Sequence, residues 1–463
     1  MRDTKGRVYK GVDEIVDPIV KVSNIEDVGF DEVVEMTMRD NSTRVGRVMK
    51  VSRDSAVIQV FEGTSGMTLR DTLVKFTGKS FSINVSTDML GRIFDGLGRP
   101  IDGGPQVLTG ESRDVNGYPI NPSSREYPDD FIQTGVTAID VMNTLTRGQK
   151  LPIFSASGLS HNKLAAQITK QAKIGDAQSQ FAVIFAGMGL KHDEAYFFKE
   201  SFRTSGVLNN VVMFLNLADD PAIESIITPR AALTLAEYLA FDKGMHVLVI
   251  LTDMINYCSA LREVASARGD LPARKGYPSY LYSDLAELYE RCGRIKGGSG
   301  SITQIPILSM PNDDITHPVP DLTGYITEGQ IVLDRRLALL GVYPPVSLLP
   351  SLSRLMKDGI GKGKTRADHA HLASQLYASY AKVQEIRSLA SIIGEDELSE
   401  VDRDYLFFGE TLETKFLQQR EDENRPIISS LDLGWSILSI LPPSELSRVT
   451  QDEIKQYHHY VKK

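Results

Sequence analysis

The sequence predicts a chain of three parts: a small β-barrel or sandwich, an α/β domain with a mostly parallel sheet, and an α-helical bundle. Short strands that alternate apolar and polar residues come first, long apolar strands alternating with helical windows follow, and strand patterns then stop. The 463 residues are enough for two or three domains. We place their limits at 1–78, 79–350 and 351–463.

The first part contains short β-branched segments separated by turns that contain Gly or Asp-Asn. The clearest segments are 17–22, 33–38, 47–51 and 56–61. Each alternates apolar and polar residues, as a strand with one buried face does. We expect five or six such strands with no helix between them, which is typical of a small barrel or sandwich.

The middle part has continuous apolar strands at 182–186, 210–215 and 246–252. Helical windows separate them, and Leu164 and Ile168 fall on one face of the helix expected before the first strand. This alternation predicts a mostly parallel sheet covered by helices on both faces. Such a sheet binds ligands beyond the carboxyl ends of its strands.

The last part shows helical spacing only. Leu372, Leu376 and Tyr380 recur on one helical face, and Gly394 is a stop signal after them. Ser399 begins a capping-box pattern for another helix.

The composition excludes several classes of protein. The net charge of −9 argues against a nucleic-acid-binding platform, and no window reaches the about 18 apolar residues of a membrane span. The N-terminus lacks the apolar run of a signal peptide, so we expect the chain in the cytosol. Cys258 and Cys292 form no CxxC pair and are expected to be core thiols. The histidine pairs lack neighbouring carboxylates or thiolates, so no metal site is expected.

Several long segments resemble the rotary ATPase family, in the order in which that family has them. These segments are 90–102, 133–140, 147–154, 236–241, 252–258, 316–325, 326–331 and 350–355. The resemblance covers essentially the whole chain, and it is closest to the B-subunit family of the vacuolar and archaeal types. It implies that the middle part is a RecA-like nucleotide-binding domain.

The resemblance also implies partners and a location. A homologous catalytic A subunit would alternate with this chain in a three-plus-three ring, around a central stalk and beside a peripheral stalk. ATP or ADP with Mg would bind at the interface with the catalytic partner, and no nucleic acid is expected. The complex would lie on the cytoplasmic face of the cell membrane, which this chain would reach only through its partners. The short N-terminus favours an archaeal or bacterial complex over a eukaryotic vacuolar one.

The phosphate loop expected after the strand 151–154 departs from the working pattern GxxxxGK[ST]. His161 replaces the lysine that reaches the phosphates, and Asn162 replaces the hydroxyl residue that binds magnesium. Ser155 and Ser160 stand where glycines would be, and Ser157 and Gly158 are candidate nucleotide contacts. The loop is therefore either a structural remnant or a weak ADP or ATP site that uses backbone N–H groups at the helix start. Lys163 is one position late, which rotates its side chain about 100° away.

Two further positions bear on catalysis. Leu190 stands where catalytic members of the family have a glutamate that orients water, and leucine cannot do this. Asp253 keeps the place of the magnesium-associated aspartate. Without its hydroxyl partner, Asp253 is either a structural carboxylate, which we favour, or part of the nucleotide site.

Arg354 is the residue for which the resemblance implies a catalytic role. It would be an arginine finger that reaches the γ-phosphate held by the neighbouring catalytic protein. The alternative is a surface or packing arginine. Arg262 is a weaker interface candidate that a salt bridge would explain equally well. The run Gly361–Thr365 echoes a phosphate loop but lacks the preceding strand, so we interpret it as a glycine-rich loop.

Two rival functions stay open at this point. One is a self-sufficient hexameric ATPase, either a catalytic rotary subunit or a nucleic-acid translocase, which His161, Asn162 and Leu190 count against. The other is a ring scaffold without a role in chemistry, which Arg354 counts against. Ala273 and Ser279 stand where the family more often has glycines, which leaves the geometry of that loop open.

Overall fold

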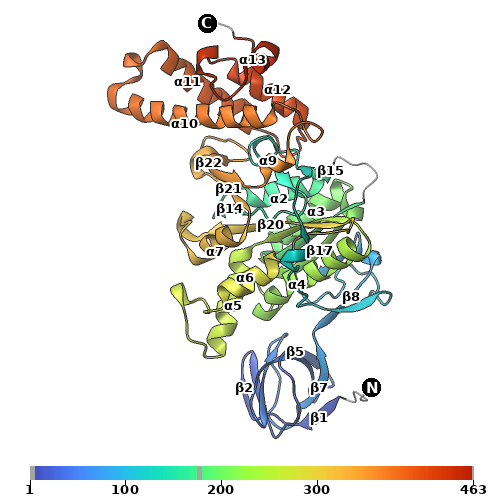
Figure 1. Cartoon of the computed structure of the whole chain (residues 1–463). Coiled ribbons are helices and arrows are strands. Elements are labelled where there is room, and N and C mark those ends of the chain that lie inside the picture. Colours follow the sequence, from blue (N-terminus) through green and yellow to red (C-terminus); the bar gives the residue numbers. More distant parts are fainter. Residues whose placement is uncertain (1–5, 175–179, 461–463) are drawn as a thin grey trace.

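The computed structural model describes residues 6–174 and 180–460. Three bodies follow one another along the long axis of the molecule: a curled β-sheet, an α/β body and a group of helices (Figure 1). This order confirms the predicted fold class.

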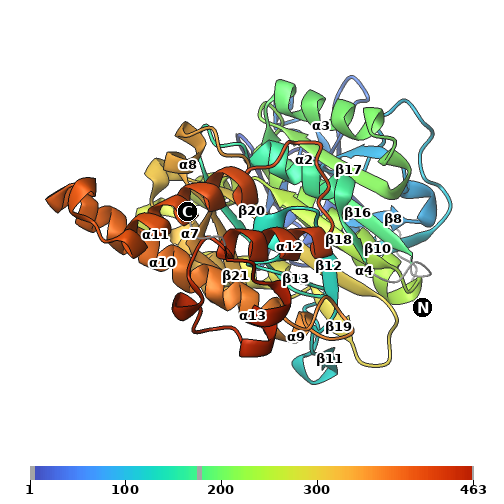
Figure 2. The same cartoon turned by 90° about the horizontal axis from the view of Figure 1, so that it is seen from above.

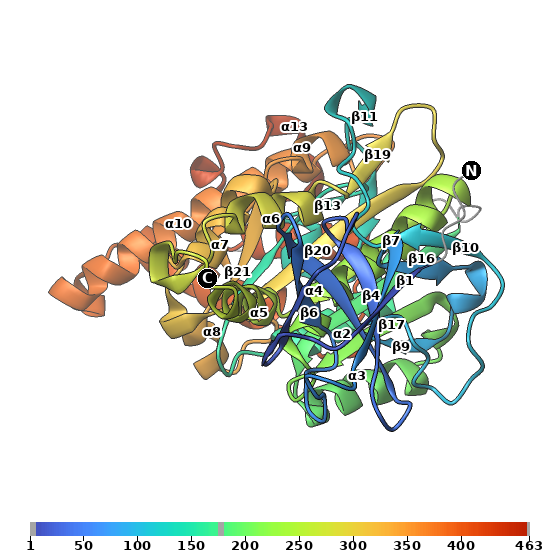
Figure 3. The ribbon, with the colours of Figure 1, turned by 90° about the horizontal axis from the view of Figure 1, so that it is seen from below.

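The N-terminal body is a curled antiparallel sheet, seen from below in Figure 3. Its strands are β1 (Arg7–Lys10), β2 (Glu14–Val16), β3 (Ile19–Ser23), β4 (Glu32–Thr37), β5 (Thr43–Val51), β6 (Ser55–Val60) and β7 (Leu73–Ser80). Their order in the sheet is β1-β7-β4-β5-β6-β3-β2. Val34 and Met36 of β4 face the interior, with the predicted alternation. The sheet has seven strands where five or six were expected, because β1 and β2 are too short to show a pattern.

The central body contains a ten-stranded sheet with the main order β22-β21-β14-β20-β18-β16-β17-β9. The strands on this path are β9 (Ile93–Asp95), β14 (Ile153–Ala156), β16 (Phe181–Leu190), β17 (Val211–Leu217), β18 (His246–Thr252), β20 (Ser301–Met310), β21 (Gly329–Leu333) and β22 (Val346–Ser353). Neighbours on this path are parallel except β21 and β22. The predicted mostly parallel sheet is confirmed.

Shorter strands complete this body. They are β8 (Ser82–Val85), β10 (Glu111–Asp114), β11 (Arg125–Glu126), β12 (Phe131–Gln133), β13 (Leu145–Thr146), β15 (Lys173–Ile174) and β19 (Gly293–Ile295). β19 joins β11 to β20, while β8 pairs with β10 and β12 pairs with β13 and β15.

Helices cover both faces of the central sheet. They are α1 (Thr137–Asp140), α2 (His161–Gln171), α3 (His192–Thr204), α4 (Ala222–Glu237), α5 (Met254–Ala267), α6 (Leu281–Tyr289), α7 (Pro318–Ile326), α8 (Arg335–Leu339) and α9 (Met356–Gly359). α2 and α3 pack with one face of the strands, and α4 and α5 pack with the other. Leu164 and Ile168 of α2 are fully buried, as their spacing predicts.

The C-terminal body consists of α10 (His369–Ile393), α11 (Glu400–Thr411), α12 (Ile427–Leu438) and α13 (Gln451–Tyr457), seen from above in Figure 2. Leu372 and Leu376 of α10 are fully buried. Gly394 ends α10 with a φ of +89°, a conformation that favours glycine. The Ser399 hydroxyl accepts a hydrogen bond from the Asp402 N–H and caps α11. Both helix signals are confirmed.

β7 ends at Ser80 and β22 at Ser353, and the limits 1–78, 79–350 and 351–463 stay predictions. Cys258 and Cys292 are buried free thiols. Within residues 6–174 and 180–460, no helix is long and apolar enough to cross a membrane, and no cluster of His, Cys, Asp or Glu could hold a metal ion.

Candidate functional site

The carboxyl edge of the parallel sheet gathers most residues singled out from the sequence. Ser155 near the end of β14 lies in register with Ser309 near the end of β20, and Asp253 follows the adjacent strand β18. The loop between β14 and α2 starts from the same edge. The predicted phosphate loop is therefore at the position where open α/β sheets bind ligands.

The loop after β14 keeps the turn of a phosphate loop, but its side chains form hydrogen bonds within the chain. Gly158 has a φ of +81°, and α2 begins at His161. The His161 Nδ1 atom lies within hydrogen-bond distance of the Ser155 hydroxyl, at 3.0 Å. The imidazole is thus held against the preceding strand, where a working loop would extend a lysine toward the phosphates.

Asn162 connects two helices. Its amide nitrogen donates a hydrogen bond of 2.9 Å to a Glu194 carboxylate oxygen, and the other Glu194 oxygen accepts the N–H of Lys191 at 3.0 Å. The amide oxygen of Asn162 is buried and has no partner among the described residues. Glu194 was not singled out from the sequence, because nothing local connects it to a residue 32 positions earlier.

Lys163 points away from the loop, as its position on the helix predicts. Its amine forms an ion pair of 2.7 Å with Glu421, which lies between the helical segments of the C-terminal body. Both side chains are about half exposed. In this arrangement Lys163 does not take the place of the phosphate-loop lysine.

Arg335 is a residue near this loop that sequence reasoning missed. It begins α8, and its Nη2 atom donates a hydrogen bond of 2.9 Å to the carbonyl oxygen of Ser157. Its guanidinium also binds the Asp313 carboxylate through two hydrogen bonds, of 2.8 and 2.9 Å. The positive charge of Arg335 is therefore neutralised by Asp313, and the arginine fixes the loop backbone.

Asp253 has both carboxylate oxygens occupied by protein donors. Its Oδ1 accepts the N–H of Ile255 at 2.7 Å, and its Oδ2 accepts both the N–H of Ser309 at 3.1 Å and the Ser309 hydroxyl. Burial raises the pKa of Asp253, while the Ser309 hydrogen bond and nearby His161 act in the opposite direction. These bonds cap α5 and join β18 to β20, which supports the structural interpretation of Asp253.

Leu190 belongs to the hydrophobic core. It is 2% exposed and ends β16. A Cβ atom added to Gly187 would lie 2.4 Å from the Leu190 Cδ1 atom, so the leucine folds back over Gly187. The leucine side chain therefore turns inward, and it leaves no carboxylate at this position.

Arg354 differs from these residues because it is exposed and lacks a strong partner. It follows β22, and its N–H donates to the Glu328 carbonyl oxygen at 3.0 Å. Its guanidinium reaches only the Thr327 carbonyl oxygen, at 3.5 Å, and no described carboxylate forms an ion pair with it. It lines a hollow of about 520 Å³ together with Lys357 and Arg448.

The remaining candidates have local explanations. The guanidinium of Arg262 lies over the Tyr277 ring, 5.3 Å from its centre, and no described carboxylate forms a salt bridge with it. In the glycine-rich run, the Lys364 amine donates to the carbonyl oxygens of Asp129 at 2.5 Å and Asp358 at 2.7 Å. These contacts fit a structural turn that joins the C-terminal and central bodies.

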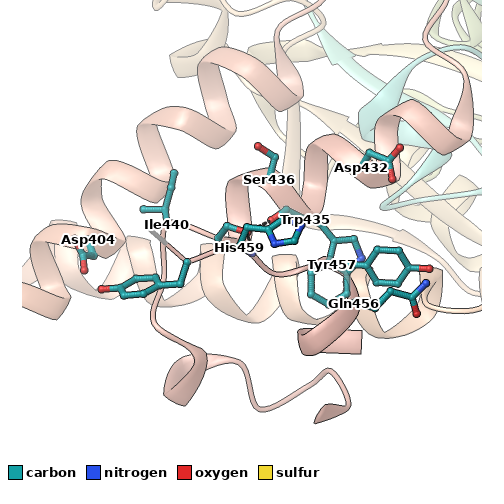
Figure 4. Close-up of a pocket in the computed structure, with 10 residues that line it drawn as sticks. Asp404, Asp432, Trp435, Ser436, Ile440, Gln456, Tyr457 and His459 are labelled. Atoms are coloured by element: carbon teal, nitrogen blue, oxygen red, sulfur yellow. Dashed lines mark hydrogen bonds between the residues drawn. The ribbon is translucent and has the colours of Figure 1, made fainter. Parts of the chain in front are cut away.

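A further hollow, of about 510 Å³, lies within the C-terminal body (Figure 4). The rings of Trp435 and Tyr457 stack there, with centres 5.4 Å apart. The indole N–H of Trp435 donates a hydrogen bond of 2.6 Å to Asp368, and Arg366 lies over the Tyr457 ring. Trp435 and Tyr457 thus have partners within the chain, and the residues that line this hollow all belong to the C-terminal body.

Comparison with known families identifies the family to which this chain belongs. Residues 135–353 match the nucleotide-binding domain of the ATP synthase alpha/beta family, and 13–78 match its beta-barrel domain. Residues 358–458 match the C-terminal domain of V and A type ATP synthase. The chain belongs to the ATP synthase alpha/beta family.

Individual relatives within this family agree along almost the whole chain. The chain is 62% identical to a V-type ATP synthase beta chain of Halothermothrix orenii over 97% of each sequence. It is 58% identical to the B subunit of an A-type ATP synthase of Aeropyrum pernix over 98% of each. A solved structure of a unique ATP synthase subunit NeqB from Nanoarcheaum equitans is 41% identical with a TM-score of 0.73, covering 91% of this chain and 98% of that one. These comparisons confirm the resemblance to the B-subunit family of the vacuolar and archaeal types.

Proposed function

We propose that this chain is the non-catalytic B subunit of a V/A-type rotary ATP synthase and supplies Arg354 to an ATP site on a homologous catalytic subunit. The observation that carries the proposal is the state of Arg354. Its guanidinium is exposed at the end of β22 and is not neutralised by a described carboxylate. It is therefore available to an anion outside the chain.

The chain's own loop supports the same division of roles. A magnesium–triphosphate site needs a cationic side chain, a hydroxyl ligand and a free carboxylate. His161 binds Ser155, Asn162 binds Glu194, and both oxygens of Asp253 accept protein hydrogen bonds. These residues do not fit Mg with a triphosphate, so we propose weak or no nucleotide binding at this loop.

The arginine has a defined chemical task in this proposal. During phosphoryl transfer, negative charge spreads over the oxygens of the γ-phosphoryl group. A planar guanidinium with a permanent charge stabilises two of those oxygens at once, which a lysine amine does not do. An arginine supplied in this way accelerates transfer by about 10³–10⁵-fold. The catalytic partner would hold ATP or ADP with Mg at the shared interface.

The assembly follows from the same proposal. Three copies of this chain would alternate with three catalytic A subunits around a central stalk, supported by a peripheral stalk. The ring would lie peripherally on the cytoplasmic face of the cell membrane and couple ATP hydrolysis or synthesis to ion transport. The match to family models over the barrel, nucleotide-binding and C-terminal domains supports this placement.

The test is ATPase turnover of the reconstituted ring with wild-type chain, Arg354→Lys and Arg354→Ala. We expect ATPase turnover to fall by about 10³-fold or more in Arg354→Ala. Arg354→Lys should recover little of it, because a lysine amine lacks the planar guanidinium that contacts two phosphoryl oxygens at once. Arg448→Ala removes a cation from the same hollow and serves as the matched control. Gel filtration of each ring establishes that assembly is intact.

The outcomes separate the rival functions. Intact rings with unchanged turnover in Arg354→Ala would leave the chain as a scaffold. Robust ATP turnover by the purified chain alone would instead establish a self-sufficient ATPase, and His161, Asn162 and Leu190 would then need another explanation.

A further inference from the structure

A cavity of about 620 Å³ lies between the N-terminal body and the central body, away from the carboxyl edge of the sheet. Three arginines from three elements line it: Arg47 of β5, Arg230 of α4 and Arg268, the residue after α5. Their side chains are 16%, 8% and 18% exposed, respectively. Three guanidinium groups are thus brought together in a largely buried place by segments far apart in the sequence.

Each guanidinium has a close carboxylate partner within the chain. Arg47 pairs with Asp31 at 3.4 Å, Arg230 with Asp284 at 2.9 Å, and Arg268 with Asp270 at 2.5 Å. The formal charge of the cluster is therefore nearly balanced. The hydrogen-bond capacity of the cluster is not balanced, and this difference indicates what kind of ligand it would accept.

The arginines have more donors than the protein uses. The Nε atoms of Arg47, Arg230 and Arg268 are all buried and have no hydrogen-bond partner among the described residues. Arg47 donates only through Nη1 and Arg268 only through Nη2 in the bonds found within the described chain. Buried donors of this kind are normally satisfied in folded proteins.

The acceptors of the cluster are in contrast already used. The two oxygens of Asp31 accept from Arg47 and from the Asn116 amide, the latter at 2.6 Å. The two oxygens of Asp284 accept from Arg230 and from the Tyr257 hydroxyl. Glu287 lines the cavity as well, but it is 57% exposed and lies 3.9 Å from Arg230. A ligand that completes this site must bring acceptor oxygens.

The surroundings of Arg47 disfavour its positive charge. Burial lowers the pKa of Arg47 from its ordinary value, and the positive charge of Arg230 acts in the same direction, against the neighbouring Asp31. An anion placed between the guanidinium groups would relieve this repulsion.

We propose that this cavity binds a phosphoryl group, either free phosphate or the phosphate of an ester. A tetrahedral phosphate presents more acceptor oxygens than a carboxylate does, and guanidinium forks match its geometry. Bound there, it connects β5 of the N-terminal body with α4 and α5 of the central body. The proposal is independent of Arg354, which follows β22 and lines a separate hollow together with residues of α10 and Arg448.

The direct test is equilibrium binding of radiolabelled inorganic phosphate to the purified full chain by flow dialysis. Arg47→Gln and Arg268→Gln each remove one guanidinium and are expected to weaken binding by about 10–100-fold, because each removes a charged hydrogen bond. Arg268→Lys, which keeps the charge, should recover part of the affinity. Arg39→Gln removes an exposed arginine of the N-terminal body and should bind phosphate like the wild type.

Further measurements test whether each variant is folded and whether the bound phosphoryl group comes from free phosphate or from an ester. Circular dichroism melts of each variant show whether the fold is intact. ADP that competes with phosphate, with the same dependence on Arg47 and Arg268, supports the site with an ester as ligand. Arg354→Ala should leave phosphate binding unchanged, which keeps this test separate from that of the proposed function. No binding at millimolar phosphate, or equal binding by wild type and both glutamine variants, would overturn the proposal.

Discussion

The imidazole Nδ1 atom of His161 lies 3.0 Å from the hydroxyl oxygen of Ser155, so the first residue of α2 is bound back to the end of β14. In a working phosphate loop, the lysine at this position extends toward the β- and γ-phosphates. The substitution therefore changes both the charge and the direction of the side chain. The loop geometry is kept while its ligand chemistry is lost.

Restoring the two lost side chains should restore binding without catalysis. In His161→Lys/Asn162→Thr, the lysine supplies a charge-assisted bond and the threonine a hydroxyl, which together should raise ADP affinity by about tenfold or more. The purified variant should still not turn over ATP, because Leu190 provides no carboxylate for water. Fluorescent-nucleotide titration and a coupled ATPase assay measure the two properties.

Lys163→Gln is the matched control for that experiment, because its amine is paired with Glu421. It should leave ADP affinity unchanged. A large loss of affinity would show that Lys163 reaches the nucleotide in solution, and the ion pair with Glu421 would then have to break when nucleotide binds.

Replacing Leu190 by glutamate should destabilise the chain and not activate it. Leu190 is 2% exposed and packs over Gly187, so a carboxylate there would be buried without a partner. We expect a loss of about 3 kcal/mol or more for the uncompensated charge. Leu190→Met keeps volume and polarity and should cost less than about 1.5 kcal/mol. Thermal melts of both variants give the comparison, and an unchanged melting temperature for Leu190→Glu would contradict this interpretation.

Much of the fold could be predicted because its signals are local. The alternation in β4, the helical spacing of Leu372 and Leu376, and the stop at Gly394 each depend on residues within a few positions. The substitutions at His161 and Asn162 were visible for the same reason, since the loop pattern defines where a lysine and a hydroxyl should stand.

The contacts that complete the loop and the cavity join residues distant in sequence, and no local sequence pattern predicts them. Arg335 binds the Ser157 carbonyl from 178 positions away, and Glu194 binds Asn162 from 32 positions away. The cavity between Arg47 and Arg230 needs the N-terminal body placed against α4. Such pairs depend on topology, which composition and periodicity do not define.

Glu413 should be important for the junction of the central and C-terminal bodies. It is 5% exposed and accepts from Arg387 at 2.7 Å, from the Tyr380 hydroxyl at 2.6 Å and from Arg336 of α8 at 3.2 Å. Glu413→Gln leaves two guanidinium groups without their carboxylate and should destabilise this junction by about 3–5 kcal/mol. Glu410→Gln, on an exposed position of α11, should cost little. Differential scanning calorimetry measures the melting temperatures of both variants. Equal melting temperatures for Glu413→Gln and Glu410→Gln would show that Glu413 contributes no more to stability than a surface charge.

His369 should make the stability of the chain depend on pH. It is fully buried, its Nε2 atom lies 2.9 Å from the Val141 carbonyl oxygen, and its Nδ1 atom lies 3.0 Å from the Thr365 hydroxyl. Burial lowers the pKa of His369 from 6.5 to about 4. The unfolded chain therefore binds a proton that the folded chain does not between these values, and stability falls as the pH falls from 6.5 to about 4.

Protonation of this histidine in the unfolded chain should cost the fold about 3 kcal/mol on acidification, as the difference between its folded and unfolded pKa requires. His369→Gln removes the titrating group, so its melting temperature should fall less between pH 6.5 and pH 4 than that of the wild type. His371→Gln, two positions on, removes an exposed histidine that pairs with Glu453 and serves as the control. If His369→Gln and the wild type lost stability in parallel, the proton taken up on unfolding would have to bind to another group.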